Sequence, residues 1–153
     1  MDLRKIGPLG CGFVTGSGTV LNALQPRPGQ TIAVFGTGAV GLAAMMAAKI
    51  SGCTKIIAVD RNDNRLALAK ELGATHTINT TKQDVVKTIK DWTGDGVDFT
   101  IDTTGVPALT KMAIDALTTG GTCAGVAVTA NVVKVSEWGD LSAFDKHFVG
   151  VLM

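Results

Sequence analysis

The chain has 153 residues, of which 46% are hydrophobic and 18% are charged, and its formal net charge is +1. This length and composition predict one globular domain with a sizeable core and exclude a disordered chain. The near-neutral charge and the lack of a basic run give no reason to expect nucleic acid or an acidic membrane as a partner.

Cysteine usage and apolar tracts bear on the compartment. Cys11, Cys53 and Cys123 are odd in number and widely spaced, which argues against a disulfide framework and against a Cys-x-x-Cys zinc site. The first residues show no apolar signal region. The longest apolar tract is interrupted by Lys49, so it is predicted to be a buried helix and not a membrane span. We therefore expect a cytoplasmic protein.

The residues before the first strand are predicted to be the least regular part of the chain. Five glycines lie between Ile6 and Gly18. Thr19–Leu24 has the pattern of a short helix, and the prolines of the turn at residues 25–30 must end it. This turn leads into the first strand.

Residues 31–60 carry the pattern around which the rest of the chain is organised. An apolar run, Ile32–Phe35, leads into a glycine-rich turn and a long alanine-rich stretch, and a second apolar run, Ile56–Val59, ends on Asp60. The order strand, turn, helix, strand predicts one βαβ unit.

The turn has the spacing of the dinucleotide-binding fingerprint, with a purely structural turn as the alternative. Gly36 allows the sharp turn out of the strand, Gly38 leaves no side chain between the backbone and a diphosphate, and Gly41 lets the helix lie close to the sheet. The helix N-terminus then points free N–H groups at the anion. The predicted diphosphate site comprises Gly36, Thr37, Gly38, Ala39, Val40 and Gly41.

Asp60 is predicted to bind the ribose of the cofactor. It lies 19 positions after Gly41, where a carboxylate can accept hydrogen bonds from the adenosine ribose. Its charge would repel a 2′-phosphate, which favours NAD over NADP. Arg61 leaves NADP open, because an arginine beside the ribose could meet the extra phosphate; a solvated surface arginine is the other interpretation.

Helix and strand patterns alternate through the rest of the chain. Asn62 or Asp63 is predicted to cap a helix that Gly73 ends. The predicted elements after Asp60 are a helix over Asn64–Leu72, a strand over Thr75–Asn79, a helix over Lys82–Trp92, a strand over Val97–Asp102, a helix from Pro107 to about Leu117, and strands over Thr122–Val128 and Phe148–Leu152.

This alternation predicts an α/β fold with a doubly wound, six-stranded parallel sheet in the Rossmann order 3-2-1-4-5-6. A ligand of such a sheet lies across the C-terminal strand ends, at the switch between the first and fourth strands. Beyond the fingerprint and Asp60, that rule selects two strand ends: Thr103, Thr104 and Gly105, and Gly125, Val126 and Ala127.

Other titratable groups are given structural interpretations. His76 and His147 are single and are predicted to be solvated or packing residues. Asp98 and Asp102 share one face of the fourth strand. Such a pair could suggest acid–base chemistry, but turn capping and loop anchoring are favoured.

Four segments together resemble the zinc-containing medium-chain alcohol dehydrogenases, and are similar to the bacterial aryl- and benzyl-alcohol dehydrogenase branch. The segment Gly10-Cys11-Gly12-Phe13-Val14-Thr15-Gly16 is the specific one, because most Rossmann proteins lack it. The others are the fingerprint with Asp60, the segment Glu71–Thr75, and the segment Asp98–Gly105.

The resemblance implies hydride transfer between a primary alcohol and NAD, with the aldehyde as product. It implies that Cys11 is one of three protein ligands of a catalytic zinc, that Thr15 lies near the nicotinamide as a catalytic residue, and that Arg65 lies near the adenosine. The family's other zinc ligands come from a domain that this sequence lacks. We therefore expect the chain alone to bind the dinucleotide without oxidising alcohols, with residues 1–30 as a linker and residues 31–153 as the NAD-binding domain.

The resemblance also implies a homodimer formed through the sixth strand, where two sheets become one. Two other functions stay open. One is a stand-alone NAD-binding or redox-sensing module. The other is a zinc-free quinone or enone reductase, against which the presence of Cys11 argues.

Overall fold

The computed structural model of the chain describes residues 9–152. One sheet of six parallel strands has the order β3-β2-β1-β4-β5-β6. Its strands are β1 (Thr31–Phe35), β2 (Lys55–Asp60), β3 (His76–Asn79), β4 (Val97–Asp102), β5 (Leu117–Gly125) and β6 (His147–Gly150). The predicted fold class and strand order are therefore confirmed.

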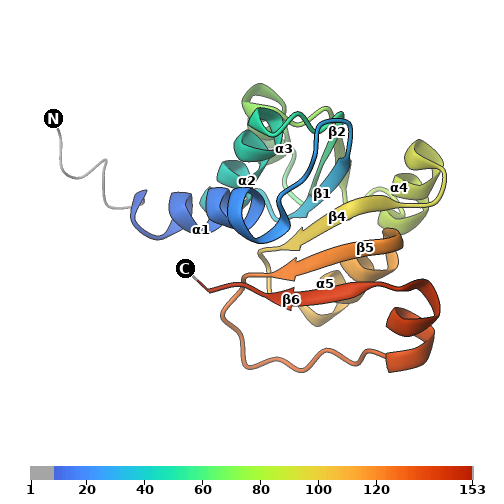
Figure 1. The fold of residues 1–153 in the computed structure, drawn as a ribbon. Coiled ribbons are helices and arrows are strands. Elements are labelled where there is room, and N and C mark those ends of the chain that lie inside the picture. Colours follow the sequence, from blue (N-terminus) through green and yellow to red (C-terminus); the bar gives the residue numbers. More distant parts are fainter. Residues whose placement is uncertain (1–8, 153) are drawn as a thin grey trace, which may run out of the picture.

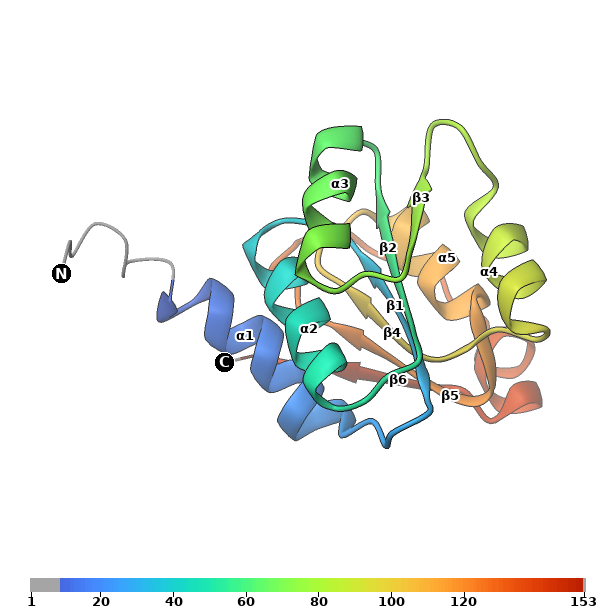
Figure 2. The ribbon, with the colours of Figure 1, turned by 90° about the horizontal axis from the view of Figure 1, so that it is seen from above.

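Helices cover both faces of the sheet (Figures 1 and 2). On one face lie α1 (Gly12–Gly18), its continuation as the π-helix η3 (Thr19–Leu24), α2 (Ala39–Ile50) and α3 (Asp63–Leu72). On the other face lie α4 (Val85–Thr93) and α5 (Pro107–Asp115), and two short turns, η4 (Glu137–Leu141) and η5 (Ser142–Phe144), precede β6.

The alternating side chains of β1 show how the sheet separates two apolar cores. Ile32 and Val34 pack toward the α2 side, whereas Ala33 and Phe35 pack toward the α4 and α5 side. All four are fully buried, as expected for a strand with helices on both faces. No helix within residues 9–152 is long and apolar enough to cross a membrane.

The prediction for the glycine-rich segment before β1 was wrong, because residues 12–18 form a helix. The reason lies in its packing against α2. A Cβ atom on Gly16 would lie 2.1 Å from the Val40 carbonyl oxygen and 2.9 Å from Ala43 Cβ, and one on Gly12 would lie 3.2 Å from Ala39 Cβ. The glycines thus permit close contact between two helices.

The predicted cap of α3 is confirmed, whereas α4 starts later than predicted. Asn62 caps α3, its side chain accepting from Asn64 N at 3.0 Å. Helix α4 begins at Val85 and not at Lys82, because Asp84 is its N-cap and accepts from Lys87 N at 3.0 Å. Both are side-chain oxygens that satisfy free N–H groups of a first turn.

The last two strands are displaced from their predicted ranges. Strand β5 starts at Leu117, then departs from regular pairing with β4, and pairs again from Thr122 to Gly125. It ends at Gly125 and not at Val128, because the chain then leaves the sheet. Strand β6 covers residues 147–150 and not 148–152.

Candidate functional site

The glycine-rich turn after β1 is held against the end of β4. Gly36 has φ +95°, a conformation that favours glycine, and its N–H donates to the Val59 carbonyl at 2.8 Å. The Thr103 hydroxyl donates to the Phe35 carbonyl at 2.9 Å. A Cβ atom on Gly36 would lie 2.3 Å from that hydroxyl oxygen, so the turn requires glycine here.

The next two glycines shape the start of α2 differently. A Cβ atom on Gly41 would lie 1.9 Å from the Gly36 carbonyl oxygen, whereas one on Gly38 would meet no atom within 4 Å. Gly38 is the N-cap residue, and no side chain caps this N-terminus. The first turn of α2 therefore presents uncapped N–H groups to open space, an arrangement that suits a diphosphate.

Asp60 lies at the end of β2 and is tied to the turn. Its Oδ2 atom accepts from Thr37 N at 2.9 Å and from the Thr37 hydroxyl at 2.7 Å, and its Oδ1 atom accepts from Asn62 N at 3.0 Å. Because a carboxylate oxygen accepts about two hydrogen bonds, Thr37 fills both acceptor positions of Oδ2.

The pKa of Asp60 reflects these contacts. Partial burial raises the pKa, but the hydrogen bonds from Thr37 and from the backbone N–H groups of Asn62 and Arg61 lower it more, so the net shift is downward. Asp60 is therefore ionised at neutral pH and can accept from a ligand hydroxyl.

A cavity of about 460 Å³ brings much of the predicted cofactor site together. It contains the predicted residues Gly36, Thr37, Gly38, Asp60, Arg61, Arg65, Thr103 and Thr104. The sequence interpretation missed Val59, Thr80, Val106 and Leu109, which also line it. Thr80 directly follows β3, so the strand-end rule could have found it.

The predicted residues at the ends of β4 and β5 do not all line the cavity at Asp60. Gly105, Gly125 and Ala127 line a second cavity of about 400 Å³, next to the segment of residues 126–136. Val126 instead packs against the core on the α2 side. The structure thus separates these residues from the cavity at Asp60, although all follow neighbouring strands.

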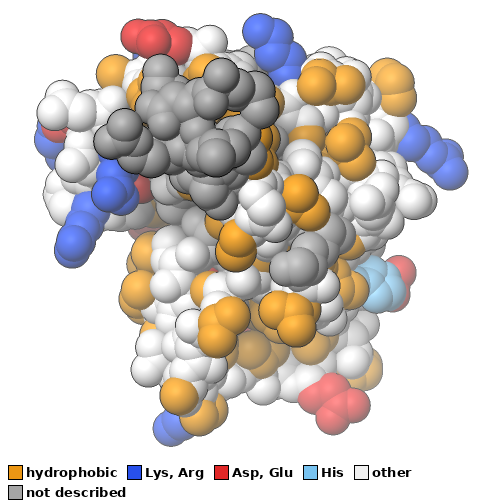
Figure 3. All heavy atoms as spheres, turned by 90° about the vertical axis from the view of Figure 1, so that its left-hand side faces the viewer, with side chains coloured by type: hydrophobic (Ala, Val, Ile, Leu, Met, Phe, Trp, Pro, Cys, Tyr) orange, Lys and Arg blue, Asp and Glu red, His pale blue; other side chains and the backbone are white. Residues whose placement is uncertain are grey.

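Figure 3 views the molecule from the side toward which β4, β5 and β6 point in Figure 1, and hydrophobic side chains gather there. Val106, which follows β4, is 45% exposed, and Val128, which follows β5, is 93% exposed. The C-terminal edge of the sheet is therefore apolar as well as glycine-rich.

Helix α1 places Cys11 and Thr15 near the start of α2. Gly12, the first residue of α1, faces Ala39, the first residue of α2. Cys11 is exposed and its carbonyl accepts from Thr15 N at 3.0 Å, one helical turn away. Thr15 is 8% exposed, and its carbonyl accepts from the Thr19 hydroxyl at 2.7 Å.

Within residues 9–152, no three His, Cys, Asp or Glu side chains are grouped so as to hold a metal ion. A catalytic zinc needs about three protein ligands and an open position. Of the zinc ligands implied by the resemblance, the described part of the chain supplies Cys11, so its residues do not by themselves fit a zinc ion.

The acidic residues of β4 have structural partners. Asp98 Oδ2 accepts from Thr31 N and from the Thr31 hydroxyl, both at 2.7 Å. Asp102 accepts from Thr104 N at 2.8 Å and from the Thr110 hydroxyl at 2.5 Å. These contacts agree with the favoured interpretation of loop anchoring.

Cys53 and Cys123 are unsuited to act as nucleophiles or metal ligands at neutral pH. Burial raises the pKa of the Cys123 thiol to about 12, and burial with the charge of nearby Asp98 raises that of Cys53. Both thiols stay protonated and are therefore inert.

The histidines also have neighbours within the chain. The His76 ring lies 4.8 Å from the Trp92 ring, measured between centroids. His147 Nε2 lies 3.7 Å from Asp145 Oδ1. His76 is thus a packing residue, and His147 is an exposed residue beside a carboxylate.

Comparisons with known proteins agree with this geometry. A sequence model of the family described as "Zinc-binding dehydrogenase" matches residues 39–153. Geraniol dehydrogenase of Castellaniella defragrans is 41% identical over 131 residues, which are 85% of this chain and 35% of the relative. Alcohol dehydrogenase class-2 isozyme 2 of Oryctolagus cuniculus is 42% identical over 133 residues, with the same coverage of 85% and 35%.

Solved structures give the same result. The crystal structure of benzyl alcohol dehydrogenase from Acinetobacter calcoaceticus has a TM-score of 0.94 and 42% identity, covering 99% of this chain and 42% of that one. An alcohol dehydrogenase zinc-binding domain protein from Burkholderia ambifaria has a TM-score of 0.93 and 45% identity, covering 99% and 41%.

The chain spans about a third of the length of the curated relatives it matches. The chain therefore belongs to the zinc-binding dehydrogenase family, and it corresponds to the coenzyme-binding domain of a zinc-type medium-chain alcohol dehydrogenase.

Proposed function

We propose that the chain binds NAD across the C-terminal ends of the strands. The observation that carries this proposal is the uncapped N-terminus of α2, which faces open space at Gly38 within the same cavity as Asp60. The diphosphate lies on the first turn of α2, where N–H groups and the helix dipole attract an anion.

Asp60 binds the adenosine ribose in this proposal. Its Oδ1 atom is the acceptor assigned to the ribose, because both positions on Oδ2 are taken by Thr37. The ionised carboxylate disfavours the 2′-phosphate of NADP. Arg61 and Arg65 line the same cavity, which keeps NADP as the competing cofactor to be tested.

In a longer protein that includes this domain, we propose that the activity is oxidation of a primary alcohol to an aldehyde. Bound NAD supplies the nicotinamide ring that accepts the hydride from the carbinol carbon, and a proton is released. The chain's contribution is to bind and orient the dinucleotide, with Thr15 beside the nicotinamide. Two similar proteins are named for benzyl alcohol and geraniol, which supports small primary alcohols as the substrate class.

We assign Cys11 as one ligand of a catalytic zinc ion whose other ligands lie outside this chain. The exposed position of Cys11 at the start of α1 leaves its thiol accessible to such partners. Because the described residues complete no zinc site, this chain alone is not expected to oxidise alcohols.

We also propose a homodimer through β6 and a cytoplasmic location. Strand β6 pairs with β5 on one side, and its four residues are exposed. The three cysteines are free, which fits a reducing compartment.

The test is calorimetric titration of the chain with NAD and with NADP. The unmodified chain should bind NAD more tightly than NADP. Asp60→Ala should weaken NAD binding by about tenfold, as expected for a lost charged hydrogen bond of about 1.5 kcal/mol, and should reduce the preference over NADP. Gly38→Ala should weaken both cofactors alike, because its methyl group would occupy the space assigned to the diphosphate.

Absence of NAD binding by the unmodified chain would reject the proposal. Tighter binding of NADP than of NAD would reject the cofactor preference and would assign a 2′-phosphate contact to Arg61 or Arg65.

A further inference from the structure

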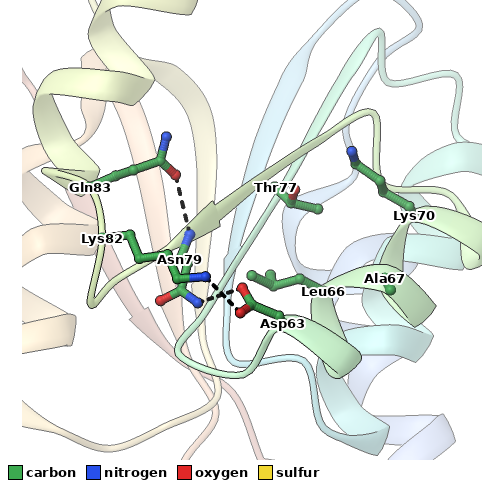
Figure 4. A pocket seen from close by; sticks show the side chains of 8 residues that line it. All are labelled: Asp63, Leu66, Ala67, Lys70, Thr77, Asn79, Lys82 and Gln83. Carbon is green, nitrogen blue, oxygen red and sulfur yellow. Dashed lines mark hydrogen bonds and ion pairs between the residues drawn. The ribbon is translucent and has the colours of Figure 1, made fainter.

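Asn79, the last residue of β3, is hydrogen-bonded to residues of two other segments, and Figure 4 shows its bond to Asp63. Its Nδ2 atom donates to the Arg61 carbonyl at 3.3 Å and to Asp63 Oδ1 at 2.7 Å. Its Oδ1 atom accepts from Thr81 N at 3.0 Å and from the Thr81 hydroxyl at 2.7 Å. Both donors and both acceptor positions of the amide are therefore used.

The partners of Asn79 belong to the connection between β2 and α3. Asp63 is the first residue of α3, and its Oδ2 atom pairs with Lys82 Nζ at 2.7 Å. At the other end of the connection, Asp60 is held by Thr37. The residues from 60 to 63 are thus fixed from two sides, by the glycine-rich turn and by Asn79.

Residues of this connection line two different cavities. Asp60, Arg61 and Thr80 line the cavity assigned to the cofactor. Asp63 and Asn79 line a different cavity of about 510 Å³, drawn in Figure 4. Asn79 does not line the cofactor cavity, and it contacts the backbone of a residue that does.

The burial of Asn79 makes the loss of any of its hydrogen bonds costly in free energy. The residue is 6% exposed, so an unpaired amide proton or carbonyl there could not be satisfied by bulk water. The side chains of the Asp63–Lys82 ion pair are 64% and 62% exposed. Ion pairs in such exposed positions contribute little to stability. The amide of Asn79, and not the ion pair, is therefore the stronger restraint on the connection.

We infer that Asn79 is a positioning residue for the adenosine half of the cofactor. It holds the connection in the conformation that presents Asp60 and Arg61 to the cavity, and it acts through the Arg61 carbonyl and Asp63. This inference rests on the proposed binding of NAD, because the residues that Asn79 positions are those assigned to the ribose.

The main test is the nearly isosteric variant Asn79→Asp. It replaces the amide donor with a carboxylate beside the Asp63 carboxylate, which accepts at 2.7 Å in the unmodified chain. Like charges at this separation repel, so the connection must move. The Kd for NAD and the Kd for AMP should both rise by about tenfold, since AMP carries the half of the cofactor that the connection contacts.

The matched control is Gln83→Leu, which lies in the same cavity. It gives up a hydrogen bond of 3.4 Å from Asn79 N but leaves Arg61 and Asp63 untouched. Its Kd for NAD should stay within about twofold of the unmodified chain, which is less than about 0.5 kcal/mol.

A second pair of variants tests the inference without changing Asn79, in case Asn79→Asp fails to fold. Asp63→Ala removes the shorter hydrogen bond of Asn79, and the Kd for NAD and for AMP should rise by about fivefold. Asp63→Asn keeps an acceptor for Asn79 and removes only the exposed ion pair, so it should bind like the unmodified chain. A general structural defect would not produce this rescue.

Wild-type affinity for AMP in Asp63→Ala, or equal losses in Asp63→Ala and Asp63→Asn, would overturn the positioning role while NAD binding stands. So would a folded Asn79→Asp that binds AMP as tightly as the unmodified chain. Failure of the unmodified chain to bind NAD would instead overturn the proposed function, and this inference with it.

Discussion

At the scale of single residues, the contact between Thr37 and Asp60 can be tested directly by substitution. Both the N–H and the hydroxyl of Thr37 donate to one carboxylate oxygen, and together they help to lower the pKa of Asp60 against the opposing effect of burial. A group whose pKa is lower in the folded state stabilises the fold above its unfolded pKa, and this contribution is lost as the pH falls through the folded pKa.

Thr37→Val should therefore destabilise the fold in a pH-dependent way. Valine keeps the shape and the backbone N–H but removes the hydroxyl donor at 2.7 Å. At pH 7 the loss should be about 1 kcal/mol, at the low end for a hydrogen bond to a charged group because Asp60 is only partly buried. Urea unfolding of both chains at a series of pH values measures the difference, which should shrink as the pH falls through the folded pKa of Asp60, a pKa that lies below the ordinary value of an aspartate.

Thr37→Ser is the matched control, since it keeps the hydroxyl and should follow the unmodified chain in its pH dependence. A stability difference for Thr37→Val that is the same at pH 7 and at acid pH would mean that the hydroxyl acts through packing and not through the charge of Asp60.

At the same scale, the sequence indicated Asp60 and the three fingerprint glycines because their roles depend on local spacing. It did not indicate Asn79, Val106 or Leu109. The sequence around Asn79 does not indicate that its side chain bonds to several segments. Its partners Arg61 and Asp63 follow β2 and are brought close to Asn79 by the pairing of β2 with β3. Its role becomes visible only when the register of the sheet is known.

At the scale of elements, α1 shows where sequence interpretation fails and why. Glycine in a helix lowers stability by about 1 kcal/mol relative to alanine, so a segment with Gly12, Gly16 and Gly18 is predicted to be irregular. The tertiary contact with α2 reverses this preference, because Gly16 lies against the backbone of Val40 and the side chain of Ala43. Val40 and Ala43 lie 24 and 27 positions after Gly16, so no local window contains both partners.

Gly16→Ala tests which effect dominates. Helix propensity alone predicts a gain of about 1 kcal/mol. The new Cβ atom, however, would lie 2.1 Å from the Val40 carbonyl oxygen, which is backbone and cannot move aside alone. We expect a net loss of about 2 kcal/mol in the free energy of unfolding, within the range for overpacked sites, measured by urea denaturation.

Gly10→Ala is the comparison, because a Cβ atom there meets nothing within 4 Å. It should change the free energy of unfolding by less than about 0.5 kcal/mol, as surface substitutions do. Stabilisation by Gly16→Ala would show that α1 can separate from α2 at little cost, and the helix contact would then be a weak feature of the fold.

Strand order was predictable at this scale and strand ends were not. Right-handed crossovers leave few arrangements for alternating strands and helices, and the fingerprint identifies the first strand. The start of β5 depends instead on how residues 117–121 depart from pairing with β4, and Gly120 with φ +77° contributes to that departure. Such irregularities follow from packing at the strand N-termini, which composition does not encode.

At the scale of the whole molecule, β6 is an exposed edge with unused backbone groups. Val151 N donates to the Gly125 carbonyl at 3.0 Å, which places the N–H groups of alternate residues, Phe148 and Gly150, on the side away from β5. Phe148 and Val149 are also partly exposed, at 46% and 36%. An edge with free donors and apolar side chains tends to pair with another strand.

We therefore expect two copies of the chain to pair through β6 in solution, and Gly150→Pro should prevent it. Proline removes the outward N–H of residue 150 while leaving the bonds to β5, and edge strands tolerate proline on the solvent side. A Cβ atom at Gly150 would meet no atom within 4 Å, so the fold has room for the ring's first atom. Gly150→Ala, which keeps the N–H, should remain dimeric.

Multi-angle light scattering at matched concentrations measures the mass of each variant. Cofactor titration is the second measurement, and the Kd for NAD should stay within about twofold of the unmodified chain in both variants. The reason is that the cofactor cavity lies at β1, β2 and β4 and not at this edge. If the unmodified chain is monomeric at high concentration, or if Gly150→Pro dimerises as well as Gly150→Ala, then pairing at β6 is not how the copies associate.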